Sequence, residues 1–339
     1  MIYRNVEFHN VAEVTPYNGG VALQRVPESV RMHLNERARQ KVMQPGSGEI
    51  RFALEPGAKA RVALATVPGD GWPAETAISV FFGEYCHRML SVGPEPTEIE
   101  IDWGARFLTC YPELAKMPHA FSPNVVRLMM RGGQVAFHSA EGDGIRPPRQ
   151  DELPSLRYLA YGTSITHGAS ASAPHLTYAA QTARHLGADL LNFGVGGACH
   201  AEPELADYFA ERDDWDIASL SLSVNMMGFE AEVFEERVRY MVHTVAKAHP
   251  GNPVGCITIF PHSGDFDAIE PEHAAKVRHF RQILRDAVGN CPTDNAHIIE
   301  GPDILARFGG LTTDLIHPAD DGMIEMGRNL AKVLRPLLT

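Results

Sequence analysis

The sequence predicts an α/β protein in which an all-β domain precedes a three-layer α/β/α domain. Between residues 49 and 139, short stretches rich in β-branched and aromatic residues recur between Gly and Pro turns, without a convincing long amphipathic helix. From residue 156 onward, apolar strands alternate with helices, which is the βαβ pattern of a mostly parallel sheet. The segment 141–155 between them is charged and proline-rich and has nothing to bury. We therefore expect domains at 1–150 and 151–339.

Six evenly spaced strands are predicted in the first domain. Their spacing and their Gly/Pro turns are typical of an antiparallel sandwich or jelly roll. The stretches are EIRFAL, ARVALATV, AISVFFGEY, TEIEIDW, NVVRLMM and QVAFHS. Residues 27–44 are less regular, and we expect a helical turn or two there.

Five strands and the helices between them are predicted in the second domain. The strands are expected at 156–161, 188–193, 216–223, 254–260 and near AHII at 296–299. One helix opens at Pro174 and closes near Gly187, and apolar residues at one-face spacing predict three more. These residues are Phe234, Val238, Met241, Val242 and Val245; then Val277, Phe280, Ile283, Leu284 and Ala287; and finally Met323, Met326, Leu330, Val333 and Leu334.

The composition limits the classes of partner. The chain has 339 residues, 44% of them apolar, which is enough for two hydrophobic cores. A formal charge of −12 gives no electrostatic footprint for nucleic acid or an anionic membrane, so small neutral or cationic partners fit better. The polar start MIYRNVEFHN lacks the apolar core of a secretory signal, and no run is long enough to span a bilayer. We expect a cytoplasmic protein, and its oligomeric state stays open.

Cysteine and histidine spacing predicts neither a metal site nor a disulfide framework. The five cysteines are widely spaced without a CxxC pair, which is typical of reduced structural thiols. The sixteen histidines include no HExxH and no pair at ligand spacing beside carboxylates. A dinucleotide site would need a third glycine at the position of Cys199. We therefore expect no metal and no cofactor.

Three loops that follow strands of the second domain carry candidate catalytic groups. The first strand runs into Gly162-Thr163-Ser164, the second into Gly194-Val195-Gly196-Gly197 and the third into Val224-Asn225. In open parallel sheets, sites form at the carboxyl ends of the strands, beside the point where strand order reverses. A flavodoxin-like strand order of 2-1-3-4-5 would bring a serine, a glycine turn and an amide side chain together.

A base for this serine is available near the end of the chain. Asp314 and His317 lie three residues apart in TTDLIHPADDG. A serine hydroxyl is a poor nucleophile until an imidazole takes its proton, and a carboxylate or a carbonyl must hold that imidazole in the correct tautomer. The spacing puts both side chains on one side of the backbone, so Asp314 or a second contact could orient His317. Ser164 alone would be read as a helix cap, but the combination predicts catalysis.

In these blocks the chain resembles the SGNH hydrolases, also called GDSL-like esterases. The blocks are GTSITHG with Ser164, NFGVGG with Asn192 and Gly197, SVNMMG with Asn225, and DLIHP with Asp314 and His317. The resemblance covers residues from about 156 to 339. It implies that Ser164 attacks an ester carbonyl and that His317, oriented by Asp314, acts as base and then as acid. The oxyanion would be bound by the backbone N–H groups of Ser164 and Gly197 and by the amide of Asn225.

Two blocks depart from the family pattern. Thr163 stands where the family usually has Asp before the serine, so we expect its hydroxyl to support the turn. The third block reads Ser223-Val224-Asn225-Met226 instead of G-x-N-D, which keeps the amide. His167, after the nucleophile turn, and His262, after the fourth strand, are candidates for the substrate pocket.

The sequence thus predicts a serine esterase that forms an acyl-serine intermediate. Because no apolar lid helix interrupts the second domain, a short acyl group is favoured, with acetyl as the leading candidate. The preceding sandwich is similar to that of two-domain carbohydrate esterases, so the expected substrate is a small ester, first among them an acetylated sugar or another polyhydroxylated molecule. Two alternatives stay open. One is an acyltransferase that uses the same residues, and the other is a non-catalytic carbohydrate-binding protein.

Overall fold

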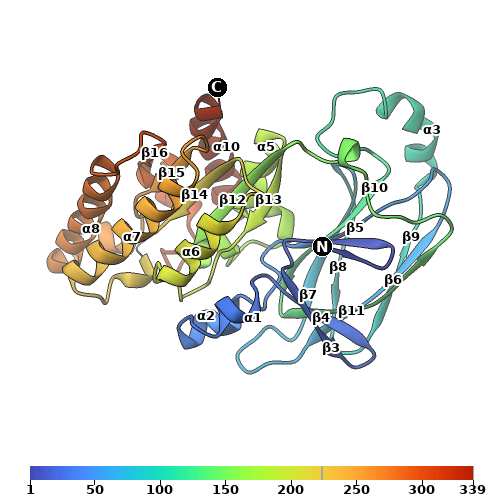
Figure 1. Cartoon of the computed structure of the whole chain (residues 1–339), viewed down its shortest axis with the longest axis horizontal. Coiled ribbons are helices and arrows are strands. Elements are labelled where there is room, and N and C mark those ends of the chain that lie inside the picture. The colour runs from blue at the N-terminus through green and yellow to red at the C-terminus, as the bar shows by residue number, and fades with distance from the viewer. Residues whose placement is uncertain (223, 339) are drawn as a thin grey trace.

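A computed structural model describes residues 1–222 and 224–338 of the chain. Ser223 of the expected third strand and third block, and Thr339 at the end of the expected second domain, lie outside the described residues. Two antiparallel sheets precede one parallel sheet, so the predicted fold class is confirmed (Figure 1). The antiparallel strands end at Gly142 and the parallel strands begin at Leu156; we call these parts the β-region and the parallel-sheet region. The exact boundary between independent domains stays a prediction.

Two packed sheets form the β-region. The first is ordered β1-β2-β5-β10-β7-β8, and the second is ordered β3-β4-β11-β6-β9. The strands of the first sheet are β1 (Ile2–Tyr3), β2 (Val6–His9), β5 (Glu49–Ala53), β10 (Val125–Gly132), β7 (Thr76–Phe82) and β8 (Tyr85–Val92). Those of the second are β3 (Glu13–Tyr17), β4 (Gly20–Gln24), β11 (Gln134–Gly142), β6 (Ala60–Val67) and β9 (Thr97–Ile101). Each of the six predicted stretches contains a strand, and apolar side chains such as Phe8, Phe52 and Phe137 fill the space between the sheets.

Three short helices belong to the β-region. Within the irregular stretch 27–44 lie α1 (Glu28–Arg31) and α2 (Glu36–Lys41), as expected for a helical turn or two. The ten-residue α3 (Ala105–Leu114) is a difference from the sequence analysis, which expected no such helix. None of its residues is fully buried, and its apolar side chains lie on the rim of the sandwich core.

The parallel sheet has the predicted order, because its strands are arranged as second, first, third, fourth and fifth along the chain. They are β13 (Ala188–Asn192), β12 (Leu156–Gly162), β14 (Ile217–Ser221), β15 (Val254–Ile257) and β16 (Ala296–Ile299). Every residue of β13, β14 and β15 is buried, as expected for strands that helices cover on both faces. The fourth strand is three residues shorter than predicted, and residues 258–260 run into the loop at the carboxyl edge.

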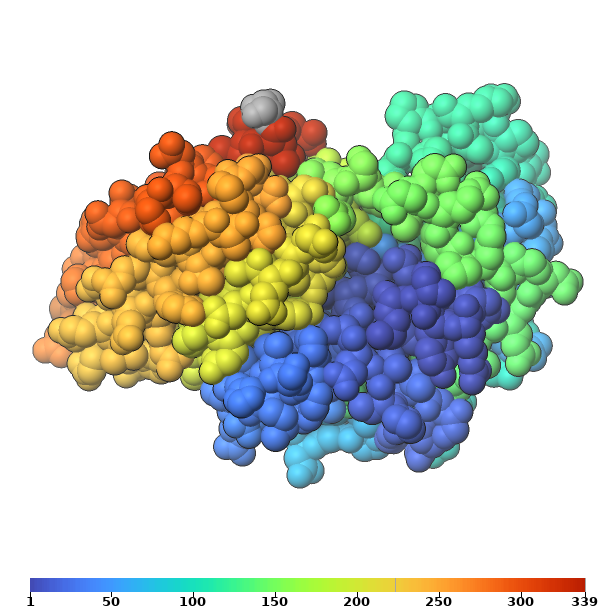
Figure 2. Space-filling model, viewed as in Figure 1, coloured from blue at the N-terminus to red at the C-terminus, as the bar shows by residue number. Residues whose placement is uncertain are grey.

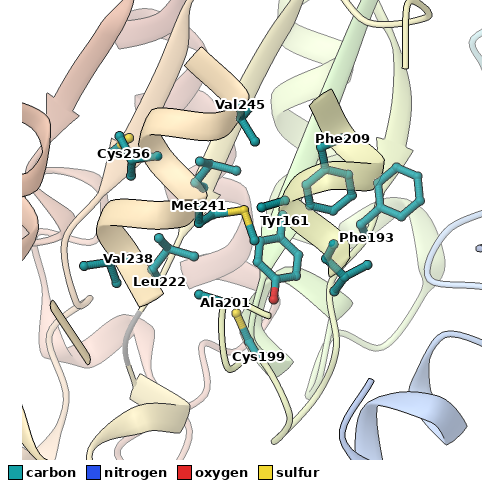
Figure 3. Packing of buried hydrophobic residues seen from close by; sticks show 14 of the residues in the cluster. Tyr161, Phe193, Cys199, Ala201, Phe209, Leu222, Val238, Met241, Val245 and Cys256 are labelled. Carbon is teal, nitrogen blue, oxygen red and sulfur yellow. The ribbon is translucent and has the colours of Figure 1, made fainter. Parts of the chain in front are cut away.

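Helices cover both faces of the parallel sheet. The helices of this region are α4 (Ser164–His167), α5 (Tyr178–Leu186), α6 (Pro203–Glu211), α7 (Ala231–Ala248), α8 (Pro271–Gly289), α9 (Gly301–Ile304) and α10 (Asp320–Leu334). One core contains side chains of α6, α7 and α8, and the other contains side chains of α5 and α10. Figure 3 shows Tyr161 of β12 packed between Phe209 of α6 and Met241 of α7. On α10, Val333 is exposed, which corrects its expected place on the buried face.

A buried ion-pair network joins the β-region to the parallel sheet. Arg51 on β5 donates to both carboxylate oxygens of Asp189 on β13, at 2.8 and 2.5 Å. Arg51 also donates to Glu49 at 2.7 Å, and Arg127 on β10 donates to both oxygens of Glu49 at 2.8 and 2.5 Å. Arg51 is fully buried and the Glu49 side chain nearly so. Because each charge has a bonded partner, the network fixes how the two parts meet without leaving an isolated buried ion.

The same network predicts loss of stability in acid. Burial alone would raise the pKa values of Glu49 and Asp189, but the facing guanidinium groups hold both below their usual range. Their contribution to stability is therefore complete above the unfolded pKa values of about 4 and is lost as the pH falls below them. We expect Glu49→Gln to flatten the dependence of unfolding free energy on pH by about 1.4 kcal/mol per pH unit at pH 3–4. Guanidinium unfolding at several pH values measures this slope, and an unchanged slope would contradict the assignment.

Candidate active site

Ser164 lies where β12 passes into the short helix α4. The buried Thr163 is the N-cap of this helix, and its hydroxyl accepts the Ile165 N–H at 3.4 Å. Gly168, with φ of +97°, ends the helix in a left-handed turn. A side chain at Gly162 would meet Thr166 Oγ1 at 2.3 Å, so the turn requires glycine there. Thr163 thus supplies local support for the serine through its hydroxyl.

Ser164, His317 and Asp314 form a continuous hydrogen-bonded relay. The distance from Ser164 Oγ to His317 Nε2 is 2.7 Å, and that from His317 Nδ1 to Asp314 Oδ2 is also 2.7 Å. When Nδ1 donates its proton to Asp314, Nε2 is left to accept the Ser164 hydroxyl. The structure therefore brings together the three residues that the sequence singled out, from elements 153 positions apart in the chain.

The loop that carries Asp314 is built to keep its carboxylate ionised. Asp314 Oδ1 accepts the backbone N–H groups of Ile316 and His317, each at 2.9 Å, and the Thr312 hydroxyl at 2.8 Å. Partial burial would raise the pKa of Asp314, but these bonds and the one from the His317 ring hold it well below its usual range. Asp314 can therefore orient His317 and compensate the charge of an imidazolium when one forms.

Three N–H donors lie at the same edge of the sheet. In the described part of the chain, the backbone N–H groups of Ser164 and Gly197 donate to no acceptor, which is unusual for loop amides beside a buried core. Asn225 Oδ1 accepts the Cys199 N–H at 3.2 Å, so this contact fixes the side chain and leaves its amide N–H groups free. Unpaired, fixed donors of this kind can bind an oxyanion.

The glycine loop is held over the nucleophile helix by Asn192. Its amide donates to the Thr166 carbonyl at 2.8 Å, and its Oδ1 accepts the Gly194 N–H at 2.8 Å. A side chain at Gly194 would lie 2.3 Å from the His167 backbone nitrogen, so glycine allows this close approach. Gly197 has φ of +69°, which also favours glycine.

Residues of the β-region complete the loop, and the sequence analysis did not find them. The Arg25 guanidinium donates to the carbonyls of Asn192 at 2.8 Å and Gly194 at 2.9 Å. Asn35, the N-cap of α2, donates to the Ala198 carbonyl at 3.0 Å. Figure 2 shows the α1–α2 segment in blue against the yellow surface that includes α6. No motif marks these residues, because their role depends on how the two parts meet.

His167 and His262, the two candidate pocket histidines, lie in different places. Half-buried His167 lies at the glycine loop, since a side chain at Gly196 would lie 3.4 Å from its Nδ1 and 3.6 Å from Ser164 Cβ. Burial and the charges of Arg25, Lys41 and Arg131 lower the pKa of His167, so its ring is neutral. Buried His262 contacts the Phe260 carbonyl through Nδ1 at 3.2 Å.

His262 also lines a small cavity near the nucleophile turn. The cavity has a volume of about 10 Å³, which is room for about one water molecule. Its walls are Thr163, Ile165, Ser221, Leu222, Val224, Ile259, Phe260, His262 and Ile316. They include the chain neighbours of Ser164, His317 and Asn225, so the cavity lies beside the relay, and most of its lining is apolar.

The described residues contain neither a metal-binding cluster nor a membrane-spanning helix. Across 1–222 and 224–338, no group of three or more His, Cys, Asp or Glu side chains is arranged to hold a metal ion. Within the same ranges, no helix combines the length and the apolar character needed to cross a membrane.

The comparisons with known proteins cover both parts of the chain. The family model described as GDSL-like Lipase/Acylhydrolase matches residues 157–335. Comparison with curated proteins found no significant match. Among solved structures, a salicylyl-acyltransferase from a tetracycline biosynthetic pathway is 16% identical, with 99% of this chain and 97% of that chain covered and a TM-score of 0.76.

Two other solved structures are similar over nearly their whole length. A protein from Bacteroides ovatus described as a GDSL-like lipase is 17% identical, with 98% of each chain covered and a TM-score of 0.69. A family two carbohydrate esterase from Cellvibrio japonicus is 12% identical, with 98% of this chain and 95% of that chain covered and a TM-score of 0.62. At these identities the likeness establishes the shared two-part fold.

Proposed function

The chain belongs to the GDSL-like lipase/acylhydrolase family and is an ester hydrolase, and from this premise we propose that it releases short acyl groups from small esters through an acyl-serine intermediate. The relay of Ser164, His317 and Asp314 carries the proposal, because both of its hydrogen bonds are 2.7 Å long. Such distances are those at which a base takes the proton of a nucleophile.

The proposed reaction has two halves. His317 Nε2 removes the Ser164 proton as Oγ bonds to the ester carbonyl carbon, and the carbonyl oxygen becomes an oxyanion that the three N–H donors bind. Collapse of this intermediate breaks the bond to the alcohol oxygen, which leaves with the proton from His317. Water then attacks the acyl-serine by the same steps, and the acid is released with Ser164 regenerated.

Asn225→Ala is expected to lower kcat by about 10²- to 10³-fold with little change in KM, because the lost donor acts on the transition state. Asn225→Asp is a matched variant, since its carboxylate can still accept the Cys199 N–H but offers no N–H to the oxyanion. We expect kcat of Asn225→Asp to fall at least as far as that of Asn225→Ala. Steady-state kinetics with an aryl acetate measure both, and near-normal turnover by Asn225→Asp would mean that Asn225 only supports the loop.

An acetyl ester of a sugar or another polyhydroxylated molecule is the substrate class we favour. The apolar cavity beside the relay has room for only about one water molecule. It offers no space for a long acyl chain, which favours a short acyl group. The similarity in fold to a carbohydrate esterase, including the β-region, supports a sugar as the alcohol. His167 and His262 are the proposed pocket residues.

An acyltransferase is the second candidate. Its support is the higher TM-score of the salicylyl-acyltransferase, which is similar over both parts of the chain. A transferase would form the same acyl-serine but deliver the acyl group to a hydroxyl acceptor instead of water. Fluorophosphonate labelling with peptide mapping, followed by acetate release from acetylated sugars and aryl acetates, separates the two. Labelling at Ser164 with acetate release supports the hydrolase, labelling without release supports the transferase, and no labelling contradicts both.

A further inference from the structure

Three cations of the β-region gather at the glycine loop, although the chain as a whole carries a formal charge of −12. We call Arg25, Arg37 and Lys41 the cationic cluster. Burial lowers the pKa of His167, and the nearby charges of Arg25 and Lys41 lower it further. Burial also lowers the pKa of Lys41, and the charges of Arg37 and Arg25 add to this effect. Three positive charges therefore lie close together at the glycine loop.

Among the described residues, no carboxylate forms an ion pair with a member of this cluster. The buried guanidinium of Arg25 donates only to carbonyl oxygens, those of Lys41, Gln44, Asn192 and Gly194, at 2.6 to 2.9 Å. Burial without a counter-ion lowers the pKa of Arg25 to about 9, so it is still cationic at neutral pH. The ammonium group of Lys41 has one long contact, 3.5 Å to the Gln44 side chain.

Arg37 is the member of the cluster that can reach a ligand. Its side chain is exposed, and among residues 1–222 and 224–338 nothing forms a hydrogen bond or an ion pair with it. A Cβ built on Gly197 would lie 2.6 Å from Arg37 Cζ and 2.8 and 2.9 Å from its two terminal nitrogens. The guanidinium therefore lies directly on Gly197, whose N–H is a proposed oxyanion donor.

The position of Arg37 is fixed by the helix that carries it. Asn35 caps α2 and binds both the Ala198 carbonyl and the Glu202 carboxylate, which also accepts the Tyr161 hydroxyl at 3.4 Å. Ala38 is buried in the core of the parallel-sheet region, together with the residue that follows the helix, Val42. Arg37 is thus presented from an anchored helix, with its head group free.

Building on the proposed esterase function, we propose that the preferred esters carry an anionic group, a carboxylate or a phosphate, close to the scissile ester, and that Arg37 binds this group. The planar guanidinium can donate two parallel hydrogen bonds to either anion. Hydrogen bonds to charged groups contribute about 1.5 to 3 kcal/mol, which is about 10- to 100-fold in kcat/KM. This specificity differs from the neutral or cationic partners that net charge alone predicts, because the local potential decides what the site binds.

The test compares matched esters that differ by one charge. The carboxylate pair is 4-acetoxybenzoate and its methyl ester, and the phosphate pair is an acetylated sugar with and without a neighbouring phosphate. The wild-type enzyme should prefer the anionic member of at least one pair, and which pair shows the preference identifies the anion. Arg37→Gln should reduce the ratio of the two kcat/KM values by about 10- to 100-fold, and Arg37→Lys by less. High salt should also reduce the wild-type preference.

Arg106→Gln is the control, because it removes one exposed positive charge from α3 and should leave the ratio unchanged. If Arg37→Gln lowered kcat/KM equally for both members of a pair, the proposal would be overturned, and Arg37 would only support the loop. A wild-type enzyme that hydrolyses neutral and anionic esters equally well would overturn it too, with the esterase function intact. Absence of fluorophosphonate labelling at Ser164 would instead overturn the esterase function itself.

Discussion

Ser164→Ala is expected to lower ester hydrolysis by about 10⁴- to 10⁶-fold and to abolish fluorophosphonate labelling, because Ser164 Oγ is the oxygen hydrogen-bonded to the His317 base. Ester hydrolysis and peptide mapping of the labelled enzyme measure the two effects. The free energy of unfolding should change little, since the Ser164 side chain is only partly buried and its one hydrogen bond is to the partly exposed ring of His317.

Non-additivity tests the relay more strictly than a single substitution. His317→Ala should cost about as much as Ser164→Ala, and the double variant should be no worse than either, because the two groups act as one unit. Ser155→Ala, at an exposed serine before β12, is the control and should be fully active. Full activity in Ser164→Ala, or independent losses that multiply in the double variant, would contradict the proposed mechanism.

Arg51→Met is expected to have the largest effect on stability, about 3 to 5 kcal/mol. Methionine fills much of the same volume, but it leaves the buried Asp189 carboxylate with His9, at 3.2 Å, as its remaining ion-pair partner within 1–222 and 224–338. Glu49 would keep the two hydrogen bonds from Arg127. Most of the loss should therefore come from Asp189. Guanidinium unfolding followed by tryptophan fluorescence measures it.

A second substitution separates the charge from the packing. Arg51→Met combined with Asp189→Leu should recover part of the lost stability, since an apolar pair has no unpaired charge to bury. Arg61→Met removes an ion pair of β6 with Glu98, whose side chains are 51% and 64% exposed, and should cost less than about 1 kcal/mol. If Arg51→Met costs no more than Arg61→Met, the buried network does not hold the two parts together.

The parallel sheet was predictable because its elements repeat simple patterns. Its strands are continuous apolar runs, and its helices repeat apolar residues along one face, so the type and length of each element can be predicted. Sites in such sheets form at the carboxyl ends of the strands, where strand order reverses, and this places Ser164, Gly197 and Asn225 at one edge. The relay was harder, since three-residue spacing allowed Asp314 or another group to orient His317. The turn decides it, because Thr312 and two backbone N–H groups lock the Asp314 carboxylate toward the ring.

Other features depend on contacts that a linear pattern does not contain. Asn35 lies in the stretch 27–44, whose sequence indicates only short helical turns, and Arg25 lies just before it, yet both contact the glycine loop more than 160 positions away. Helix α3 is short and contains Pro112, a residue that usually ends a helix, so its sequence does not favour a helix there. Val333 is exposed although Leu330 and Leu334 in the same last turn of α10 are buried, so it lies outside the buried face of that turn.

The α1–α2 segment makes the enzyme less modular than its two-part fold suggests. Val26, Leu34, Ala38 and Val42 belong to the core of the parallel-sheet region, although the chain carries them with the β-strands. Cutting at the boundary would uncover that apolar surface and take Arg25 and Asn35 away from the glycine loop. A chimaera that exchanged the β-region would thus inherit a different catalytic edge, so acquiring a new accessory part and changing specificity would be a single event.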